Sequence, residues 1–168
     1  LIPTYTDIIM ALPGESYDSF ASGVATLVER GQHTRMHFYN CSLLPNAEMS
    51  QPAYRAEFGI QTVRQAMTDL HGPIEPPPGE VTEYLEIAVA TSAMPADEWV
   101  RTKVYAWAMD LLLYDRLLYL PLVVLHAHRG IGVRAQIEAL AQASGDRFPV
   151  VASVFSGLAA HARAIQAG

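Results

Sequence analysis

The sequence has a single cysteine, Cys41, among its 168 residues. A disulfide within the chain is excluded, because it needs two thiols. A zinc or iron–sulfur site held by cysteines of this chain is excluded too, since such sites need several thiolates. So few thiols predict a reducing, cytoplasmic setting.

Charge is also sparse. Charged residues make up 17% of the chain and the net charge is −6, against an average charged fraction of about 25%. Because the sequence has no dense cluster of Lys and Arg, we expect no nucleic-acid partner. Apolar residues reach 51%, which predicts a generous core or an apolar surface that a partner or further domain covers.

The sequence has no uninterrupted apolar run of membrane-spanning length. Its longest candidate, residues 104–127, is interrupted by Asp110, Asp115, Arg116 and Pro121. A charge in the middle of a membrane costs about 2.5–3.5 kcal/mol, so three charges would cancel the gain from the apolar residues. We therefore expect a buried helix of a soluble protein and no membrane partner.

The first part of the sequence predicts a strand, a helix and a strand. Residues 5–12 are an apolar run that ends at Pro-Gly, typical of a buried strand, and residues 34–44 are a second such run. Between them, apolar residues recur at helical spacing up to a helix end near Gly31: Phe20, Val24, Leu27 and Val28. A crossover of this kind joins parallel strands.

The middle of the sequence is less regular. Residues 51–70 have a weak helical pattern, and residues 71–80 contain three consecutive prolines, typical of a stiff linker. Residues 82–91 alternate over part of their length and predict a third strand.

The last part predicts helices. Over residues 97–119 one apolar seam follows a 4,3 spacing: Val100, Val104, Trp107, Leu111, Tyr114 and Leu118. We expect Pro121 to end or kink this helix, and further helices over residues 132–143 and 150–166. The fold class is therefore α/β, with strands first and a mainly helical C-terminal region.

Two turns resemble the second half of the barrel of radical SAM enzymes. They are "ALPGES" (residues 11–16) and "LLPNAEM" (residues 43–49), each at a strand end. The tail from residue 83 onward is similar to the region after the barrel in cobalamin-binding members. Two departures are Ala11, where the family usually has Gly, and Asn46 in place of the Gly of a Pro-Gly-Thr turn.

The resemblance implies a division into three parts. Residues 1–50 would be the second half of a partial (β/α) barrel, residues 51–95 a connecting segment with the linker and third strand, and residues 96–168 the helical region. The family's Cys-x3-Cys-x2-Cys loop is not in this sequence. The chain thus resembles a C-terminal part of such an enzyme. Its start at Leu1 fits a fragment of a longer protein and a trimmed or processed terminus equally.

The resemblance also implies a SAM site at the strand ends. Its residues would be Glu15, in the turn that braces the site, and Tyr39, Asn40, Ser42 and Leu44, with backbone groups of the second strand end meeting adenine. The 4Fe-4S cluster and cobalamin are expected only in the full-length protein. Partners would be the rest of the polypeptide, with the N-terminal half-barrel and cobalamin domain, and a small-molecule substrate for methylation or rearrangement.

Other interpretations of these residues stay open. Glu15 also fits an acid at a helix start, which the helix dipole favours. Alternation places Arg35, His37 and Tyr39 on one strand face, which would line the barrel interior or form a purely structural polar lining. The opposite face, with Met36, suits helix packing.

Three further groups carry weaker signals. His126 and His128 are two residues apart, which does not suit one helix face, and no third metal ligand is near in sequence; we expect no metal site. Asp110 and Asp115, five apart, do not share a face of an α-helix. Cys41 fits a buried structural thiol better than a nucleophile.

A second function also fits the composition. The low charge fraction would suit a non-catalytic α/β module that docks a partner through the apolar helix over residues 97–119.

Overall fold

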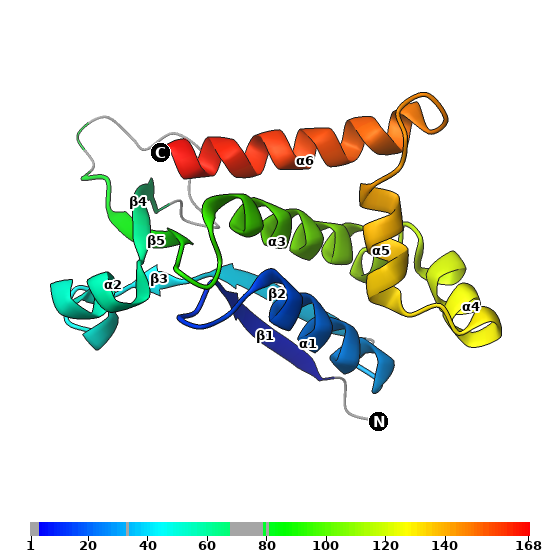
Figure 1. The fold of residues 1–168 in the computed structure, drawn as a ribbon, viewed down its shortest axis with the longest axis horizontal. Helices are drawn as coiled ribbons and strands as arrows, with labels where there is room; N and C mark the ends of the chain where they lie inside the picture. Colours follow the sequence, from blue (N-terminus) through cyan, green and yellow to red (C-terminus); the bar gives the residue numbers. More distant parts are fainter. Residues whose placement is uncertain (1–3, 33, 68–78, 80) are drawn as a thin grey trace.

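The computed structural model describes residues 4–32, 34–67, 79 and 81–168 and has an α/β fold (Figure 1). The strands are β1 Tyr5–Met10, β2 Arg35–Asn40, β3 Ser42–Leu43, β4 Gln61–Ala66 and β5 Tyr84–Ala90. The α-helices are α1 Tyr17–Glu29, α2 Pro52–Phe58, α3 Ala96–Ala108, α4 Tyr119–Arg129, α5 Val133–Ala141 and α6 Pro149–Ala167. A 3-10 turn, Glu48–Ser50, precedes α2, and a π-helical segment, Met109–Tyr114, follows α3.

The predicted crossover unit is confirmed. β1 and β2 pair in parallel, from Tyr5 opposite Arg35 to Met10 opposite Asn40. α1 connects them, and the side chain of its N-cap residue Ser16 caps the first turn in a capping box. Both strands therefore end at the same edge of this sheet.

A second sheet has the antiparallel order β3-β5-β4. The strand predicted over residues 82–91 is confirmed as β5. The strand predicted over residues 34–44 is divided at Cys41, where the chain leaves the first sheet and β3 pairs with β5 instead. In the described residues the strands do not close into a barrel.

The prediction of a helix over residues 51–70 is wrong in its second half. α2 ends at Gly59, which has a left-handed φ of 60°. A Cβ atom there would meet the side-chain oxygen of Ser92, so this turn favours glycine. β4 follows and pairs with β5, a contact distant in sequence that local periodicity does not register. The linker predicted over residues 71–80 lies, except for residue 79, outside the described residues.

The single helix predicted over residues 97–119 is also wrong. α3 passes into the π-helical segment, and the chain turns at Arg116, which has a φ of 65°. Pro121 neither ends nor kinks this helix; it lies in the first turn of α4, where a missing N–H costs no helical hydrogen bond.

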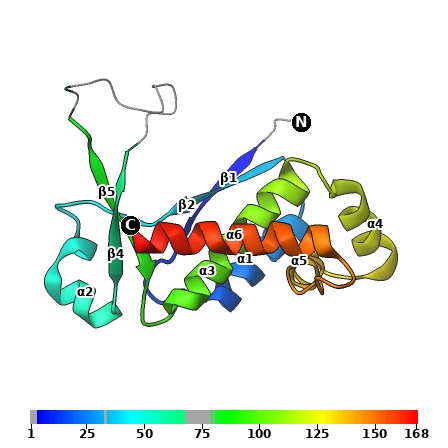
Figure 2. The ribbon, with the colours of Figure 1, turned by 90° about the horizontal axis from the view of Figure 1, so that it is seen from above.

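α3 lies at the centre of the core. α1, α5 and α6 pack around it, and α6 runs along its length (Figures 1 and 2). Trp99 and Met109 are fully buried. α5 and α6 confirm the helices predicted over residues 132–143 and 150–166. None of the helices in the described ranges has the length and apolar character needed to cross a membrane.

Candidate functional site

The candidate site lies where β1 and β2 end. Because Met10 is opposite Asn40 in the parallel ladder, the turn after β1 and the chain after β2 lie at the same edge. Glu15 is close enough to Cys41 to contribute electrostatically to the raised pKa of that thiol, although burial is the larger cause. The structure thus brings the first predicted turn, with Glu15, beside the end of β2.

Within the first turn, the Glu15 carboxylate closes a small loop. Its Oε2 accepts the backbone N–H of Ala11 at 2.9 Å, and the Glu15 N–H donates to the carbonyl of Leu12 at 3.0 Å. Burial raises the pKa of Glu15, and the backbone hydrogen bonds of Ala11 and Leu12 oppose this rise. Glu15 therefore fixes the shape of the turn, and it precedes the N-cap of α1 rather than lying in its first turn.

Ala11 adopts a left-handed φ of 63° and is fully buried. The resembling family usually has glycine here, and glycine would adopt this conformation without the cost of about 1–2 kcal/mol that a side chain adds. The Glu15 hydrogen bond to the Ala11 N–H holds this conformation.

Residues of the second strand end differ in exposure. Tyr39 is 50% exposed and Leu44 is 60% exposed, Ser42 is exposed, and Asn40 is half-buried. Ser42 lies in β3 opposite Ile87, so the backbone of Ser42 and Leu43 belongs to the second sheet, and Leu44 follows this strand. Tyr39 and Asn40 end the first sheet, opposite Ile9 and Met10, and directly precede Cys41, which senses the Glu15 charge.

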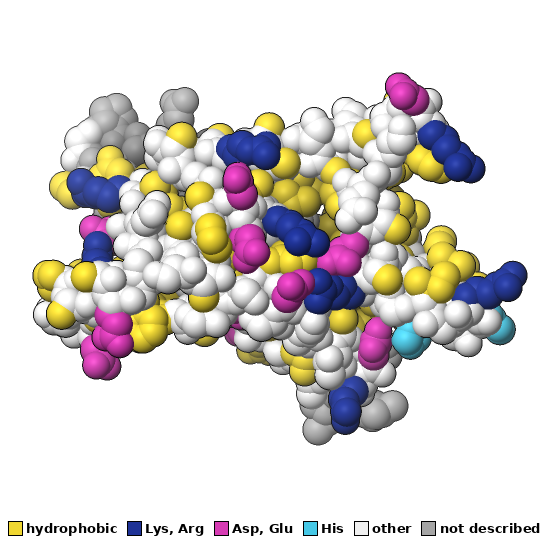
Figure 3. Space-filling model, viewed as in Figure 1, with side chains coloured by type: hydrophobic (Ala, Val, Ile, Leu, Met, Phe, Trp, Pro, Cys, Tyr) yellow, Lys and Arg dark blue, Asp and Glu magenta, His cyan; other side chains and the backbone are white. Residues whose placement is uncertain are grey.

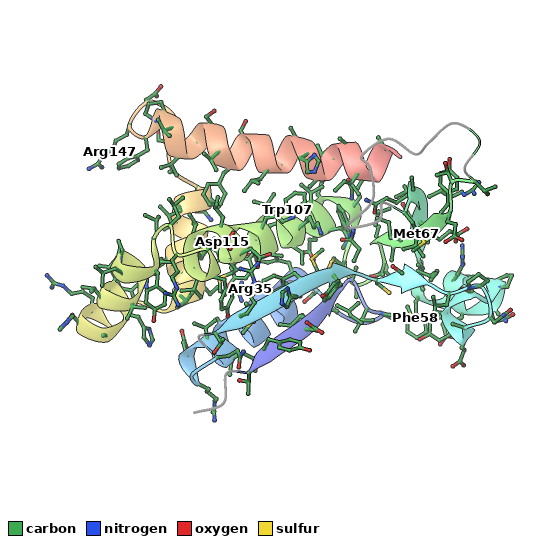
Figure 4. All side chains as sticks on the ribbon, turned by 180° about the vertical axis from the view of Figure 1, so that it is seen from behind. Arg35, Phe58, Met67, Trp107, Asp115 and Arg147 are labelled. Atoms are coloured by element: carbon green, nitrogen blue, oxygen red, sulfur yellow. The ribbon has the colours of Figure 1, made fainter. Side chains whose placement is uncertain are left out.

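One face of the first sheet is open. Met36 is fully buried on the helix side, as the alternation predicted. On the other face the Tyr5 and His37 rings meet edge to face at 5.9 Å, and the Tyr39 ring lies 6.3 Å from His37. Viewed from behind, this face of β1 and β2 is turned toward the reader, with α1 on the far side (Figure 4).

Beside this face, Arg35 binds the π-helical segment. Its Nη1 donates to Asp115 at 2.7 Å, and its Nη2 is 3.9 Å from Asp110 Oδ1 (Figure 4). The expectation that these two carboxylates do not share a face is wrong. A π-helical turn places residues five apart above one another, and the Asp115 N–H donates to the Asp110 carbonyl at 2.7 Å.

Of the two carboxylates, Asp110 has the fewer hydrogen bonds. Its buried Oδ1 lacks a hydrogen-bond partner among the described residues. Burial raises the pKa of Asp110, and the nearby Arg35 cation opposes this rise. The pair serves Arg35 as an ion-pair partner, and nothing in the geometry assigns it a catalytic role.

Lys103 also belongs to this region, although no sequence motif pointed to it. This α3 residue is only 6% exposed, and its Nζ donates to Asn40 Oδ1 at 2.9 Å. The same Nζ lies 5.0 Å from the centre of the Trp107 ring. Burial lowers the pKa of Lys103 to about 8, with Asp110 opposing the shift. The sequence does hold a sign of this burial. Lys103 is three residues after Val100 and four before Trp107, so a charged residue lies on the apolar seam of the predicted helix.

An ionic network anchors the start of α1 to α3 and α5. The Tyr17 hydroxyl donates to Glu138 at 2.7 Å, and the Arg101 guanidinium lies 3.7 Å from the centre of the Tyr17 ring. Arg134 binds both Glu138 and Asp18. Figure 3 shows basic and acidic side chains interleaved on this face. The network holds the helix that follows the Glu15 turn in place.

The remaining candidates behave as structural residues. Cys41 is buried and its pKa is raised, as a structural thiol requires. His126 and His128 lie in the last turn of α4, and His126 Nδ1 is 3.3 Å from the carbonyl of Ile131. Across the residues that the structure describes, no group of three or more His, Cys, Asp or Glu side chains could hold a metal.

Comparison with known proteins shows which enzymes this chain is similar to. The chain is 34% identical over 144 residues to the cobalamin-dependent radical SAM methyltransferase TokK of Streptomyces tokunonensis, covering 83% of the chain and 20% of TokK. The chain is related to part of a cobalamin-dependent radical SAM methyltransferase. The expected relationship to cobalamin-type radical SAM enzymes is therefore confirmed.

A second relative is the 2-(S-pantetheinyl)-carbapenam-3-carboxylate methyltransferase of Streptantibioticus cattleyicolor. It is 34% identical over 151 residues, which are 87% of the chain and 21% of that enzyme. The chain thus spans about a fifth of the length of the curated relatives it matches. No family model matches it.

Proposed function

We propose that this chain is the C-terminal part of a cobalamin-dependent radical SAM methyltransferase and forms one wall of its SAM site. The observation that carries the proposal is the shared edge of β1 and β2, with the Glu15 turn beside Tyr39 and Asn40. The methyltransferase relatives support the same assignment. Methylation of a small-molecule substrate is the reaction that their names favour.

The residues at this edge fit the adenosyl part of SAM. Adenine needs donors, acceptors and an apolar surface, and an exposed strand end with a tyrosine and an amide supplies them. In this proposal Tyr39, Asn40, Ser42 and Leu44 contact SAM, and Glu15 braces the turn. When bound, SAM would be cleaved reductively into methionine and a 5′-deoxyadenosyl radical, which is the chemistry that it supplies at such a site.

The residues do not fit the 4Fe-4S cluster. The single cysteine of the chain is buried, whereas such a cluster needs several cysteine thiolates. In this proposal the cluster and cobalamin belong to the rest of the polypeptide, and no reaction step of theirs is assigned to this chain.

The edge of β1 left unpaired in the described sheets is consistent with further barrel strands elsewhere in the same polypeptide. Among the described strands β1 pairs with β2 alone, which leaves its other edge without a partner. A groove of about 690 Å³ runs between this edge and α1, and the apolar residues Ile9 and Leu12 are exposed along it. A preceding strand of the same polypeptide would satisfy this edge.

The alternative, a module that docks a partner through the helix over residues 97–119, gains no support. The apolar side chains of α3 are buried by α1, α5 and α6 of the same chain, so they are not available to a partner.

The proposal is tested on the complete gene product. We expect a Cys-x3-Cys-x2-Cys loop upstream of this chain, SAM binding, and reductive SAM cleavage after iron–sulfur reconstitution. Replacing the three cysteines of that loop by alanine is the control and should abolish cleavage. A complete gene product without the loop would overturn the proposal.

A further inference from the structure

The environment of Lys103 is unusual for a lysine. Lysine is almost never fully buried unless it is paired, yet Lys103 is only 6% exposed and makes no ion pair with any described carboxylate. Its contacts are the hydrogen bond to Asn40 Oδ1 and the face of the Trp107 ring. A buried cation held mainly by one amide oxygen indicates that the orientation of this amide matters.

The contact with Lys103 decides which way the Asn40 amide points. An ammonium group has donors and no acceptor, so the amide atom that faces Nζ at 2.9 Å must be the oxygen. The Nδ2 group, with its two N–H donors, then points away from Lys103. Within the described part of the chain, Nδ2 donates no hydrogen bond.

The position of Asn40 in β2 relates its N–H donors to the proposed SAM site. Asn40 is the last residue of β2, opposite Met10, and it is half-buried beside the exposed Tyr39. Asn40 therefore lies at the edge where the proposed function places the adenosyl group, and its side chain leaves β2 on the helix side, opposite to the Tyr39 ring. Adenine ring nitrogens are hydrogen-bond acceptors that lack a partner unless the site provides a donor.

We propose that Lys103 is a positioning residue that locks the Asn40 side chain with its oxygen toward α3, so that its N–H donors bind the adenosyl group of SAM. This inference rests on the proposed function, which already places Asn40 against SAM, and it adds that Lys103 fixes the orientation of the Asn40 side chain. Lys103 does not touch SAM; it acts through Asn40.

The decisive variant is Asn40→Asp in the complete gene product, with S-adenosylhomocysteine as the probe and binding measured by calorimetry. The new carboxylate keeps the contact with Lys103 as an ion pair but has no N–H donor. We expect about tenfold weaker binding, since one hydrogen bond of this kind is worth about a factor of ten, with no loss of thermal stability. If Asn40 served structure alone, Asn40→Asp would bind like the parent.

Lys103→Met tests the positioning role. It leaves Asn40 free to rotate, and we expect about threefold to tenfold weaker binding. In the double variant Lys103→Met/Asn40→Asp the loss should be no larger than in Asn40→Asp alone, because both changes remove the same contact. Arg163→Met is the matched control: it removes an exposed cation of α6 that has no role in the proposed site, and should leave binding unchanged.

The outcomes separate the two claims. If the parent protein binds neither SAM nor S-adenosylhomocysteine, the proposed function falls, and this inference with it. If the parent binds but Asn40→Asp or Lys103→Met binds equally well, the inference is overturned while the proposed function stands. Fully additive losses in the double variant would also overturn it.

Discussion

Lys103→Met should stabilise the protein. The pKa of Lys103 is about 8 in the folded chain, compared with about 10.4 for an unfolded lysine. This difference means that the charged form costs about 3 kcal/mol of folding free energy at neutral pH. Methionine has a similar length and no charge. After subtracting about 1 kcal/mol for the lost hydrogen bond to Asn40, we expect a gain of about 2 kcal/mol at pH 7.

The gain should depend on pH in a defined direction. Below pH 8 Lys103 is charged in both the folded and the unfolded state, so the full free-energy cost of burying its charge lowers the stability of the parent. Between about pH 8 and pH 10.4 the unfolded chain binds more protons than the folded chain, and the stability of the parent rises with pH. The advantage of Lys103→Met should therefore shrink across this range and disappear near its upper end.

Urea unfolding of the 168-residue chain from pH 7 to pH 10 measures this effect. The two tryptophans, Trp99 and Trp107, both lie in α3, so their fluorescence reports the helix that carries the mutation. Arg101→Met is the control, because its exposed charge should give a difference that does not change over this range. A Lys103→Met chain that is less stable at pH 7, or whose gain does not vary with pH, would refute the reasoning.

Two further predictions concern stability and use the same urea assay. Tyr17→Phe removes the hydroxyl that donates to Glu138 at 2.7 Å and should cost about 1–2 kcal/mol; no loss would show that the other partners of Glu138 compensate fully. Gly59→Ala places a side chain at a left-handed φ of 60° against Ser92 and should cost at least about 1–2 kcal/mol, with Gly157→Ala, inside α6, as a neutral or stabilising comparison.

Features that are local in sequence could be predicted. The β1-α1-β2 unit follows from an apolar run, a helical stripe and a glycine near the helix end, all within 40 residues. The strand over residues 61–66 could not be predicted, because β4 forms through its pairing with β5, some 20 residues later in the chain. The division of the strand at Cys41 has the same cause.

The π-helical segment explains two errors together. Sequence periodicity assumes 3.6 residues per turn, so it extended α3 to residue 119 and separated Asp110 from Asp115. The wider turn at Met109–Tyr114 aligns these acids on Arg35. The burial of Lys103 was not predicted for a related reason. A search for apolar periodicity finds the apolar residues of a buried helix face and passes over a lysine on the same face.

Photolabelling tests the central claim most directly. The complete gene product would be irradiated with 8-azido-S-adenosylmethionine and digested with trypsin, which releases residues 36–55 as one peptide because Arg35 and Arg55 are the nearest cleavage sites. That peptide carries Tyr39, Asn40, Ser42 and Leu44. We predict labelling of residues 39–44 that excess S-adenosylhomocysteine suppresses. Suppressible labelling confined to peptides outside this chain would contradict the account.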